Sequence, residues 1–219
     1  MIDEKQISQI AERVIKRLKE EAAVKQQEKR LMGVFDSMYD AIDAAEAAYK
    51  KLKSYSIEQR ENIIAEIRKA TRENAEILAQ MGVEETGMGR VDHKIIKHML
   101  VADKTPGTED LTTTAWSGDK GLTLIEMSPY GVIGAITPST NPSETVICNS
   151  IGMIAAGNAV VFNVHPHAVN VSNYAVDMVN RAVLRAGGPE NLVCSVSKPT
   201  METSEILMKH KAVKMLVAT

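Results

Sequence analysis

The feature that most constrains this fold is an alternation of short apolar segments with helix-like segments after Gly121. Short apolar runs bounded by Gly, Pro, Asn or Ser predict strands, and the longer segments between them have helical periodicity. The predicted strands cover 122–125, 131–137, 159–163, 192–197 and a segment from 213, and the predicted helices cover 142–156, 168–186 and 201–210. Such alternation is typical of a parallel sheet with right-handed crossovers. We therefore expect an α/β fold with a Rossmann-like parallel sheet.

A helical layer is predicted before this sheet. Residues 36–53 are rich in alanine, and Ser56 with Gln59 forms a capping-box pattern for a helix that runs to about residue 71. Further helices are predicted over 72–82 and 92–103. The last of these carries His93 and His98, which lie about 140° apart around an α-helix. They are poorly placed as joint metal ligands, so we expect surface or packing roles for both.

Residues 1–20 form a separate amphipathic pattern. Ile7, Ile10, Val14 and Leu18 share one helical face, and a polar tether follows up to about residue 35. The helix either packs on its own domain or docks its apolar face into a groove of another protein. Mixed Lys and Glu on the polar face disfavour a membrane surface.

The composition of the 219-residue chain excludes several classes. Hydrophobic residues make up 44% and charged residues 25%, as in globular proteins, and a net charge of −2 does not favour nucleic acid as a partner. Two cysteines exclude a disulfide scaffold and suit a reducing compartment. We find no apolar run that would span a membrane and no signal-peptide core, so a cytoplasmic location is expected.

Polar or proline-bearing segments follow the predicted strands. Ligands of open parallel sheets bind beyond the carboxyl ends of the strands, and hydroxyl and amide groups can bind ribose and phosphate. We therefore expect cofactor contacts in these segments, although neither a G-x-G-x-x-G motif nor a P-loop is present. The candidate residues are Thr137, Pro138, Ser139 and Thr140 after the first sheet strand, Asn163, His165 and Pro166 after the second, Ser197 after the third and Thr219 after the fourth.

The start of the helix after Thr140 has two explanations. Asn141 suits an N-cap, with Pro142 at the first helical position and Glu144 at the third, so capping alone accounts for Asn141. The same free N–H groups also suit an anion or an oxyanion. His165 and His167 lack further ligands nearby, so no metal site is expected.

The two cysteines are expected to be inert. Cys148 lies within an apolar helix and Cys194 within an apolar strand, which predicts buried core thiols rather than nucleophiles.

Four ordered segments resemble the aldehyde dehydrogenase superfamily. They are P-Y-G-V-I-G-A-I-T-P at 129–138, A-G-N-A-V-V at 156–161, A-G-G-P-E-N-L-V at 186–193 and E-T-G at 85–87. The resemblance covers about residues 36–219. It implies a cofactor domain of that superfamily, in which a helical layer over 36–120 precedes a strand and Rossmann-like NAD-binding part over 121–219.

Departures from the superfamily pattern indicate a branch. P-S-T-N-P at 138–142 replaces the P-W-N-F-P of the hydrolytic enzymes, and Asn163 replaces a lysine that binds the adenosine ribose. Both features resemble the coenzyme-A-acylating branch, in particular the acetaldehyde and propionaldehyde dehydrogenases of bacterial microcompartments. The resemblance implies that a small aldehyde, CoA and NAD give acyl-CoA and NADH. It also implies oxyanion contacts near Thr140 or Asn141.

The same resemblance bears on the ends of the chain. Residues 1–20 resemble an encapsulation helix on a linker (21–35), which implies docking to a shell protein, a location in the microcompartment lumen and a homo-oligomer. The family's catalytic cysteine lies beyond Thr219, so the chain is expected to be an N-terminal portion of the enzyme. The alternative is a non-catalytic targeting or assembly fragment that binds a nucleotide without turnover.

Overall fold

A computed structural model describes residues 31–219 of the chain. The amphipathic helix predicted over 1–20 and most of the predicted linker lie outside the described residues. Within 31–219, no helix has the length and apolar character needed to cross a membrane.

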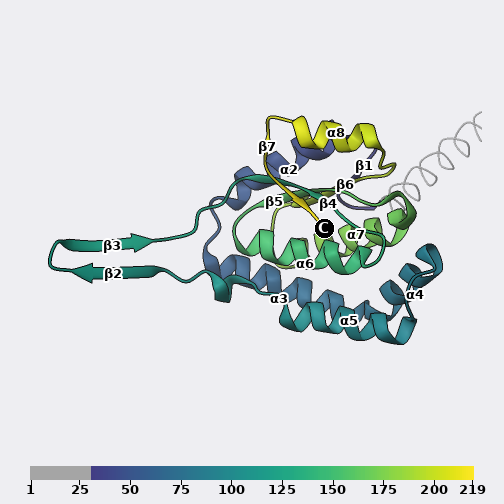
Figure 1. The fold of residues 1–219 in the computed structure, drawn as a ribbon, viewed down its shortest axis with the longest axis horizontal. Coiled ribbons are helices and arrows are strands. Elements are labelled where there is room, and N and C mark those ends of the chain that lie inside the picture. Colours follow the sequence, from purple (N-terminus) through teal and green to yellow (C-terminus); the bar gives the residue numbers. More distant parts are fainter. Residues whose placement is uncertain (1–30) are drawn as a thin grey trace, which may run out of the picture. The chain divides into compact units, whose positions relative to one another are not determined.

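A five-stranded parallel sheet forms the centre of the described part (Figure 1). Its order is β1-β6-β5-β4-β7, and every neighbouring pair is parallel. The strands are β1 (Val34–Phe35), β4 (Val132–Ile136), β5 (Ala159–Asn163), β6 (Val193–Val196) and β7 (Val213–Ala218). The predicted parallel sheet is therefore confirmed.

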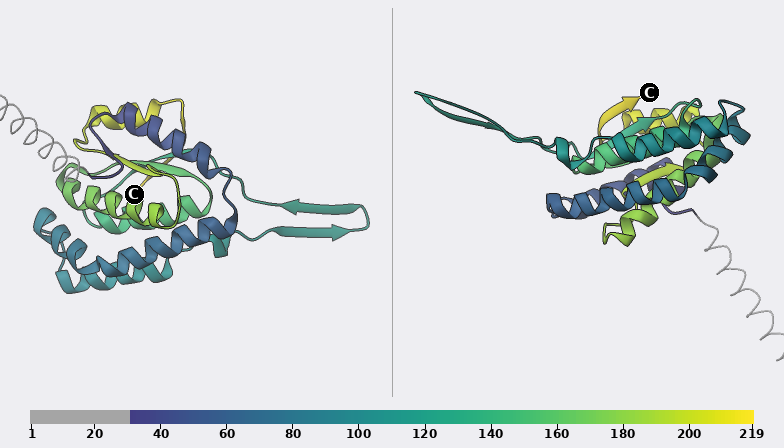
Figure 2. Two further views of the ribbon diagram at one scale, coloured as in Figure 1. Left: turned by 180° about the vertical axis from the view of Figure 1, so that it is seen from behind. Right: turned by 90° about the horizontal axis from the view of Figure 1, so that it is seen from below.

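Helices cover both faces of this sheet (Figures 1 and 2). One face is covered by α2 (Met38–Leu52) and α8 (Met201–Lys209), and the other by α6 (Pro142–Ala155) and α7 (Val169–Arg185). A further layer of α3 (Ile57–Glu73), α4 (Ala75–Thr86) and α5 (Val91–Lys104) packs on α6 and α7. Short 3₁₀ turns occur at η1 (Thr108–Asp110) and η2 (Pro166–Ala168).

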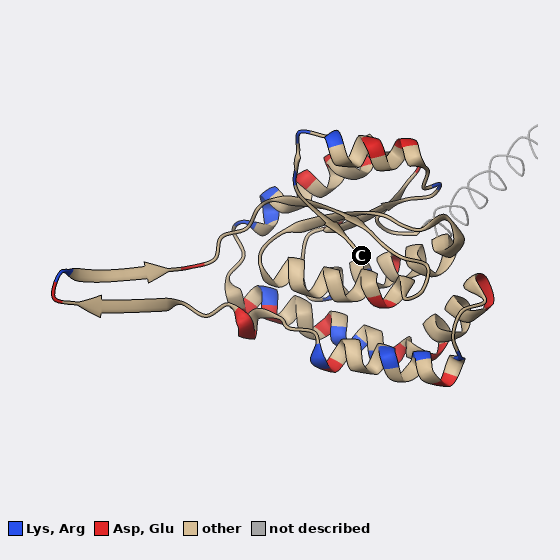
Figure 3. Cartoon of the chain, viewed as in Figure 1, with Lys and Arg blue, Asp and Glu red and all other residues tan. Residues whose placement is uncertain are grey.

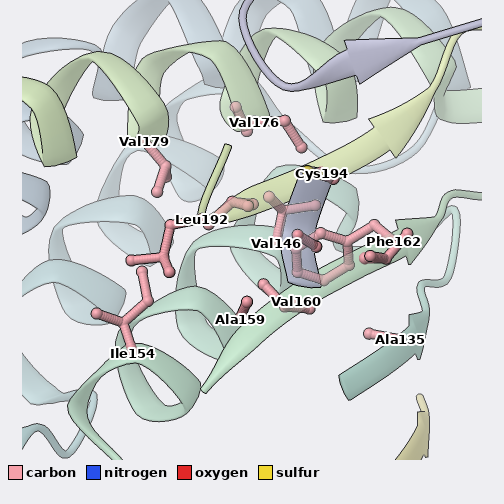
Figure 4. Close-up of a cluster of buried hydrophobic side chains, with 14 of the residues drawn as sticks. Ala135, Val146, Ile154, Ala159, Val160, Phe162, Val176, Val179, Leu192 and Cys194 are labelled. Atoms are coloured by element: carbon pink, nitrogen blue, oxygen red, sulfur yellow. The ribbon is translucent and has the colours of Figure 1, made fainter. Parts of the chain in front are cut away.

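The core lies between the sheet and its helices. Every residue of β5 is buried, and Phe162 is among the largest fully buried side chains (Figure 4). Val146 and Ile154 of α6 and Val176 and Val179 of α7 contribute to this cluster from the helical side. Burial from both faces explains why the central strands are continuous apolar runs in the sequence.

Local capping fixes the helical layer. The predicted capping box is confirmed: the Gln59 N–H donates to Ser56 Oγ at 3.1 Å, and the Ser56 N–H donates to Gln59 Oε1 at 2.9 Å. The E-T-G segment caps a helix that is distant in sequence. The Glu85 carboxylate accepts the Asn170 and Val171 N–H groups at 2.8 Å each. Glu85 thus caps α7, whose own N-cap position makes no side-chain capping bond.

Two strands occur in segments that were predicted to have other structure. β1 lies within the segment assigned to the linker and pairs with β6. β2 (Thr114–Gly118) lies within the segment assigned to the helical layer and pairs antiparallel with β3 (Gly121–Ile125), as a hairpin that projects from the body (Figure 1). A two-residue strand has no detectable period, and β2 is exposed along its length, so no buried face marked it.

The two cysteines differ in exposure. Cys194 is buried in β6, as predicted, and burial raises the pKa of its thiol. The prediction of a buried Cys148 is wrong, because this residue is exposed on α6. Apolar neighbours along the sequence did not reveal that Cys148 lies on the outward side of its helix.

Candidate nucleotide-binding site

The site is positioned by a reversal in the order of the strands. From β4 the chain adds β5 and then β6 on one side, and it then returns to place β7 on the other side of β4. In open parallel sheets ligands bind in the crevice beyond such a switch point. The loop after β4 therefore lies beside the end of β7, where the Thr219 N–H donates to the Ile136 carbonyl at 3.2 Å.

The loop after β4 carries polar groups that a ligand can use. The hydroxyl of Thr137 is buried, at 2% residue exposure, and has no hydrogen-bond partner among the described residues. Ser139 is half-buried with its hydroxyl 4.0 Å from Met88 Sδ, and Thr140 is exposed. A buried hydroxyl without a partner is costly unless a ligand or water satisfies it.

The first turn of α6 adds free donors to this loop. Asn141 occupies the N-cap position, but its side chain makes no capping bond and instead accepts from Lys97 Nζ at 3.0 Å. The explanation of Asn141 by capping is therefore wrong. Because no side chain caps α6, the N–H groups of Ser143 and Glu144 have no side-chain acceptor among the described residues, and such groups at a helix N-terminus suit an anionic ligand.

Asn163 lies at the end of β5 with its amide group largely occupied. Its Nδ2 donates to Ser204 Oγ at 2.6 Å, and its Oδ1 accepts from the Thr203 hydroxyl at 2.8 Å. Its binding to the ribose stays a prediction. In the structure Asn163 anchors the first turns of α8 to the sheet.

The remaining predicted residues are spread along the same edge. His165 and Pro166 follow β5, and His165 Nδ1 accepts from the His167 N–H at 3.1 Å. Ser197 lies two strands away from β4, and its hydroxyl donates to Asp36 at 2.8 Å. Within 31–219, no group of three or more His, Cys, Asp or Glu side chains is placed to hold a metal ion.

A buried polar cluster behind the loop was not predicted as part of the site. Lys94 of α5 is 3% exposed and Glu144 of α6 is 5% exposed, and their charged groups lie 3.1 Å apart. Lys94 Nζ also donates to the Thr140 carbonyl at 3.0 Å. Next to this pair, His98 Nε2 lies 2.9 Å from Ser143 Oγ. Figure 3 marks several charged residues along α5, but the charge of Lys94 on this helix is buried against Glu144.

The hydrogen bonds define the protonation of His98. Its Nδ1 lies 2.8 Å from the Lys94 carbonyl, which can only accept, so Nδ1 carries the proton. Burial lowers the pKa of His98, with a smaller opposing effect of Glu144, so the neutral ring is favoured. Nε2 then accepts from the Ser143 hydroxyl at 2.9 Å. The same hydroxyl lies farther from Glu144 Oε2, at 3.3 Å.

Periodicity could have identified this cluster. Lys94, His98 and Ala102 follow one another at four-residue intervals and form the buried face of α5. In contrast, Ile96 and Leu100 are exposed. The apolar residues of α5 therefore do not mark a single face, whereas the Lys and His in line with an alanine lie on the buried one.

Comparisons with known proteins agree with the observed fold. A family model described as the aldehyde dehydrogenase family matches residues 5–219. An acetylating acetaldehyde dehydrogenase of Bilophila wadsworthia is 51% identical over 187 residues, which are 85% of this chain and 38% of the relative.

Two solved structures are also similar. A propionaldehyde dehydrogenase from the Clostridium phytofermentans fucose utilisation bacterial microcompartment has a TM-score of 0.84 and 63% identity over 86% of this chain and 43% of its own. The propionaldehyde dehydrogenase of Rhodopseudomonas palustris, with bound CoA and an acylated cysteine, has a TM-score of 0.83 and 51% identity over 85% of this chain and 43% of its own. This chain thus spans about two fifths of the length of these relatives.

Proposed function

Because this chain belongs to the aldehyde dehydrogenase family, we propose that the protein that contains it is a CoA-acylating aldehyde dehydrogenase. The reaction converts a small aldehyde, CoA and NAD⁺ to acyl-CoA, NADH and a proton. The observation that carries this proposal is the 51% identity to a relative described as an acetylating acetaldehyde dehydrogenase.

In this proposal the described residues supply the dinucleotide-binding part. The buried Thr137 hydroxyl and the uncapped first turn of α6 fit a ligand with hydroxyl and phosphate groups. The adenosine half of the dinucleotide lies across the carboxyl ends of β4 and β5, near Pro138, Ser139, His165 and Pro166. When bound, NAD accepts a hydride.

The N–H groups near Thr140 and Asn141 stabilise the oxyanion in this proposal. We assign the nucleophile to a cysteine of the full-length enzyme outside this chain, in line with the family to which the chain belongs. Burial raises the pKa of Cys194 and disfavours its thiolate. Cys148 is exposed on a helix and makes no hydrogen bond to a base among the described residues.

The amphipathic pattern of residues 1–20 supports a proposed partner and location. Its apolar stripe docks to a shell protein and brings a homo-oligomeric enzyme into a microcompartment lumen. The test is co-purification with shells after Ile10 and Val14 are both replaced by Glu. Unchanged co-purification would contradict docking, and a less stable main domain would show that the helix packs on its own protein.

The activity test uses the full-length enzyme that carries this sequence. We expect NADH formation that requires both the aldehyde and CoA. Thr137→Val should raise the KM for NAD and leave the aldehyde KM nearly unchanged, with the exposed Thr123→Val as the matched control. NADH formation without CoA would overturn the acylating assignment, and an effect of Thr137→Val on the aldehyde KM alone would overturn the placement of the nucleotide.

A further inference from the structure

Lys94 makes an unusual contact for a buried lysine. Its ammonium group donates to the Thr140 carbonyl at 3.0 Å as well as to the Glu144 carboxylate at 3.1 Å. A buried ion pair adds little stability on balance, because the cost of removing both charges from water offsets their attraction. The contact with a loop carbonyl therefore needs another explanation.

The polar ends of three side chains on this part of α5 form hydrogen bonds with the same short segment. Lys94 reaches Thr140 and Glu144, Lys97 reaches Asn141, and His98 reaches Ser143. That segment contains the end of the β4 loop and the first turn of α6.

The backbone before α5 leaves room for the Lys94 side chain. Gly89 has a φ of +84°, and a Cβ added there would lie 3.3 Å from Lys94 Cε. A larger residue would crowd the lysine stem.

We propose that Lys94 is a positioning residue for nucleotide binding, an inference that rests on the proposed function. Its ammonium group holds the Thr140 carbonyl inside the protein and thereby fixes the peptide plane between Thr140 and Asn141. That plane sets the direction in which the chain enters α6. The Thr137 hydroxyl and the first N–H groups of α6 are thereby held in one arrangement.

A simpler explanation is that Lys94 only neutralises Glu144. The two explanations separate in the double variant Lys94→Met/Glu144→Met, which removes both charges and leaves no buried carboxylate unpaired. If neutralisation were the whole role, this variant would behave like the wild type. If Lys94 positions the loop, the double variant should fold but bind the nucleotide poorly.

The experiment measures kinetics, nucleotide affinity and hydrogen exchange in the full-length enzyme. Lys104→Met is the matched control, because Lys104 is exposed on the same helix. In the double variant we expect kcat/KM for NAD to fall about 10- to 100-fold, since small displacements at a site have effects of this size. The aldehyde KM should stay nearly unchanged, the affinity for NAD should fall, and amide exchange in residues 137–145 should accelerate. Lys104→Met should change none of these.

Other results would overturn either the role of Lys94 or the proposed function. Wild-type kinetics in the double variant would overturn the proposal, whether or not exchange accelerates. A loss of activity with unchanged exchange in 137–145 would also overturn it. If the wild type itself lacks CoA-dependent activity, the proposed function fails. NAD affinity and exchange in the double variant then decide the role of Lys94 without reference to turnover.

Discussion

Removal of the Glu85 carboxylate should destabilise the protein through a helix that begins 84 residues later. Glu85 lies in the last turn of α4, and both of its oxygens accept backbone N–H groups from the first turn of α7 at 2.8 Å. Glu85→Ala removes both acceptors and the negative charge at this N-terminus. α7 has no other side-chain cap among the described residues.

The expected loss follows from the surroundings of the two N–H groups. The bond to Val171 is partly buried, and its loss costs about 1–2 kcal/mol. The bond to Asn170 is exposed, so water replaces much of it at a cost of about 0.5 kcal/mol. The lost attraction between the charge and the helix dipole adds about 0.5 kcal/mol. The total is about 2–3 kcal/mol, or a Tm lowered by about 5–10 °C for a domain of this size.

The assay is urea unfolding followed by circular dichroism, with Glu84→Ala as the control. Glu84 precedes Glu85 on α4 but is exposed and accepts only from Gln80, so its removal should cost less than about 0.5 kcal/mol. Glu85→Gln should fall between the two variants, because an amide keeps one acceptor oxygen. Equal stabilities of Glu85→Ala and Glu84→Ala would refute the capping role.

Three further predictions follow from burial and backbone geometry. A thiol reagent should modify Cys148 rapidly in the native protein and Cys194 only after unfolding, since Cys194 is buried and burial raises its pKa; equal rates would contradict the assigned burial. Burial lowers the pKa of His98 below its unfolded value of 6.5, so the unfolded state binds the proton more readily than the folded state. The stability of the protein should therefore fall as the pH drops from about 7 to 5. His98→Gln should weaken that dependence in urea titrations, and an unchanged slope would be contrary evidence. Gly33→Ala should cost about 3 kcal/mol or more of folding stability, because the added Cβ would collide with backbone and side-chain atoms. Gly87→Ala has open space around it and should cost about 1 kcal/mol. Similar melting temperatures of the two variants would contradict the steric reasoning.

Sequence patterns predicted the central strand and the helices that follow the strands of the sheet. β5 was predicted over its observed range, and α6, α7 and α8 within a residue or two. A strand buried on both faces leaves a continuous apolar run, and glycines mark the ends of α6 and α7. β1 is too short for a pattern, and its pairing depends on a partner 161 residues away, at Ser195 for Val34. Such long-range pairing cannot be inferred from local composition.

The polar loop of the site was predicted, but the residues of other helices that hold it in place were not. Polar residues after strands predicted the loop of Thr137–Asn141, since the carboxyl ends of parallel strands share an edge. The contacts of Asn141 with Lys97 and of Asn163 with α8 depend on helices that are distant in sequence, so the local explanations for both residues omitted their actual partners. The same holds for Lys94, whose burial is set by α6.

The motif residues that carried the resemblance mainly hold the sheet together. Gly131 has a φ of +125°, and its N–H donates to Asn158 Oδ1 at 3.0 Å, so P-x-G and A-G-N join the starts of β4 and β5. A Cβ at Gly134 would lie 3.0 Å from Leu207 and Leu216, so this glycine allows α8 and β7 to pack on β4. Because these constraints belong to the architecture, the motifs indicate the fold with more force than they indicate the chemistry. The branch-specific segment from Pro138 to Pro142 is instead held by lysines of α5, and differences in nucleotide handling between branches are therefore expected to arise at the contact between α5 and this loop.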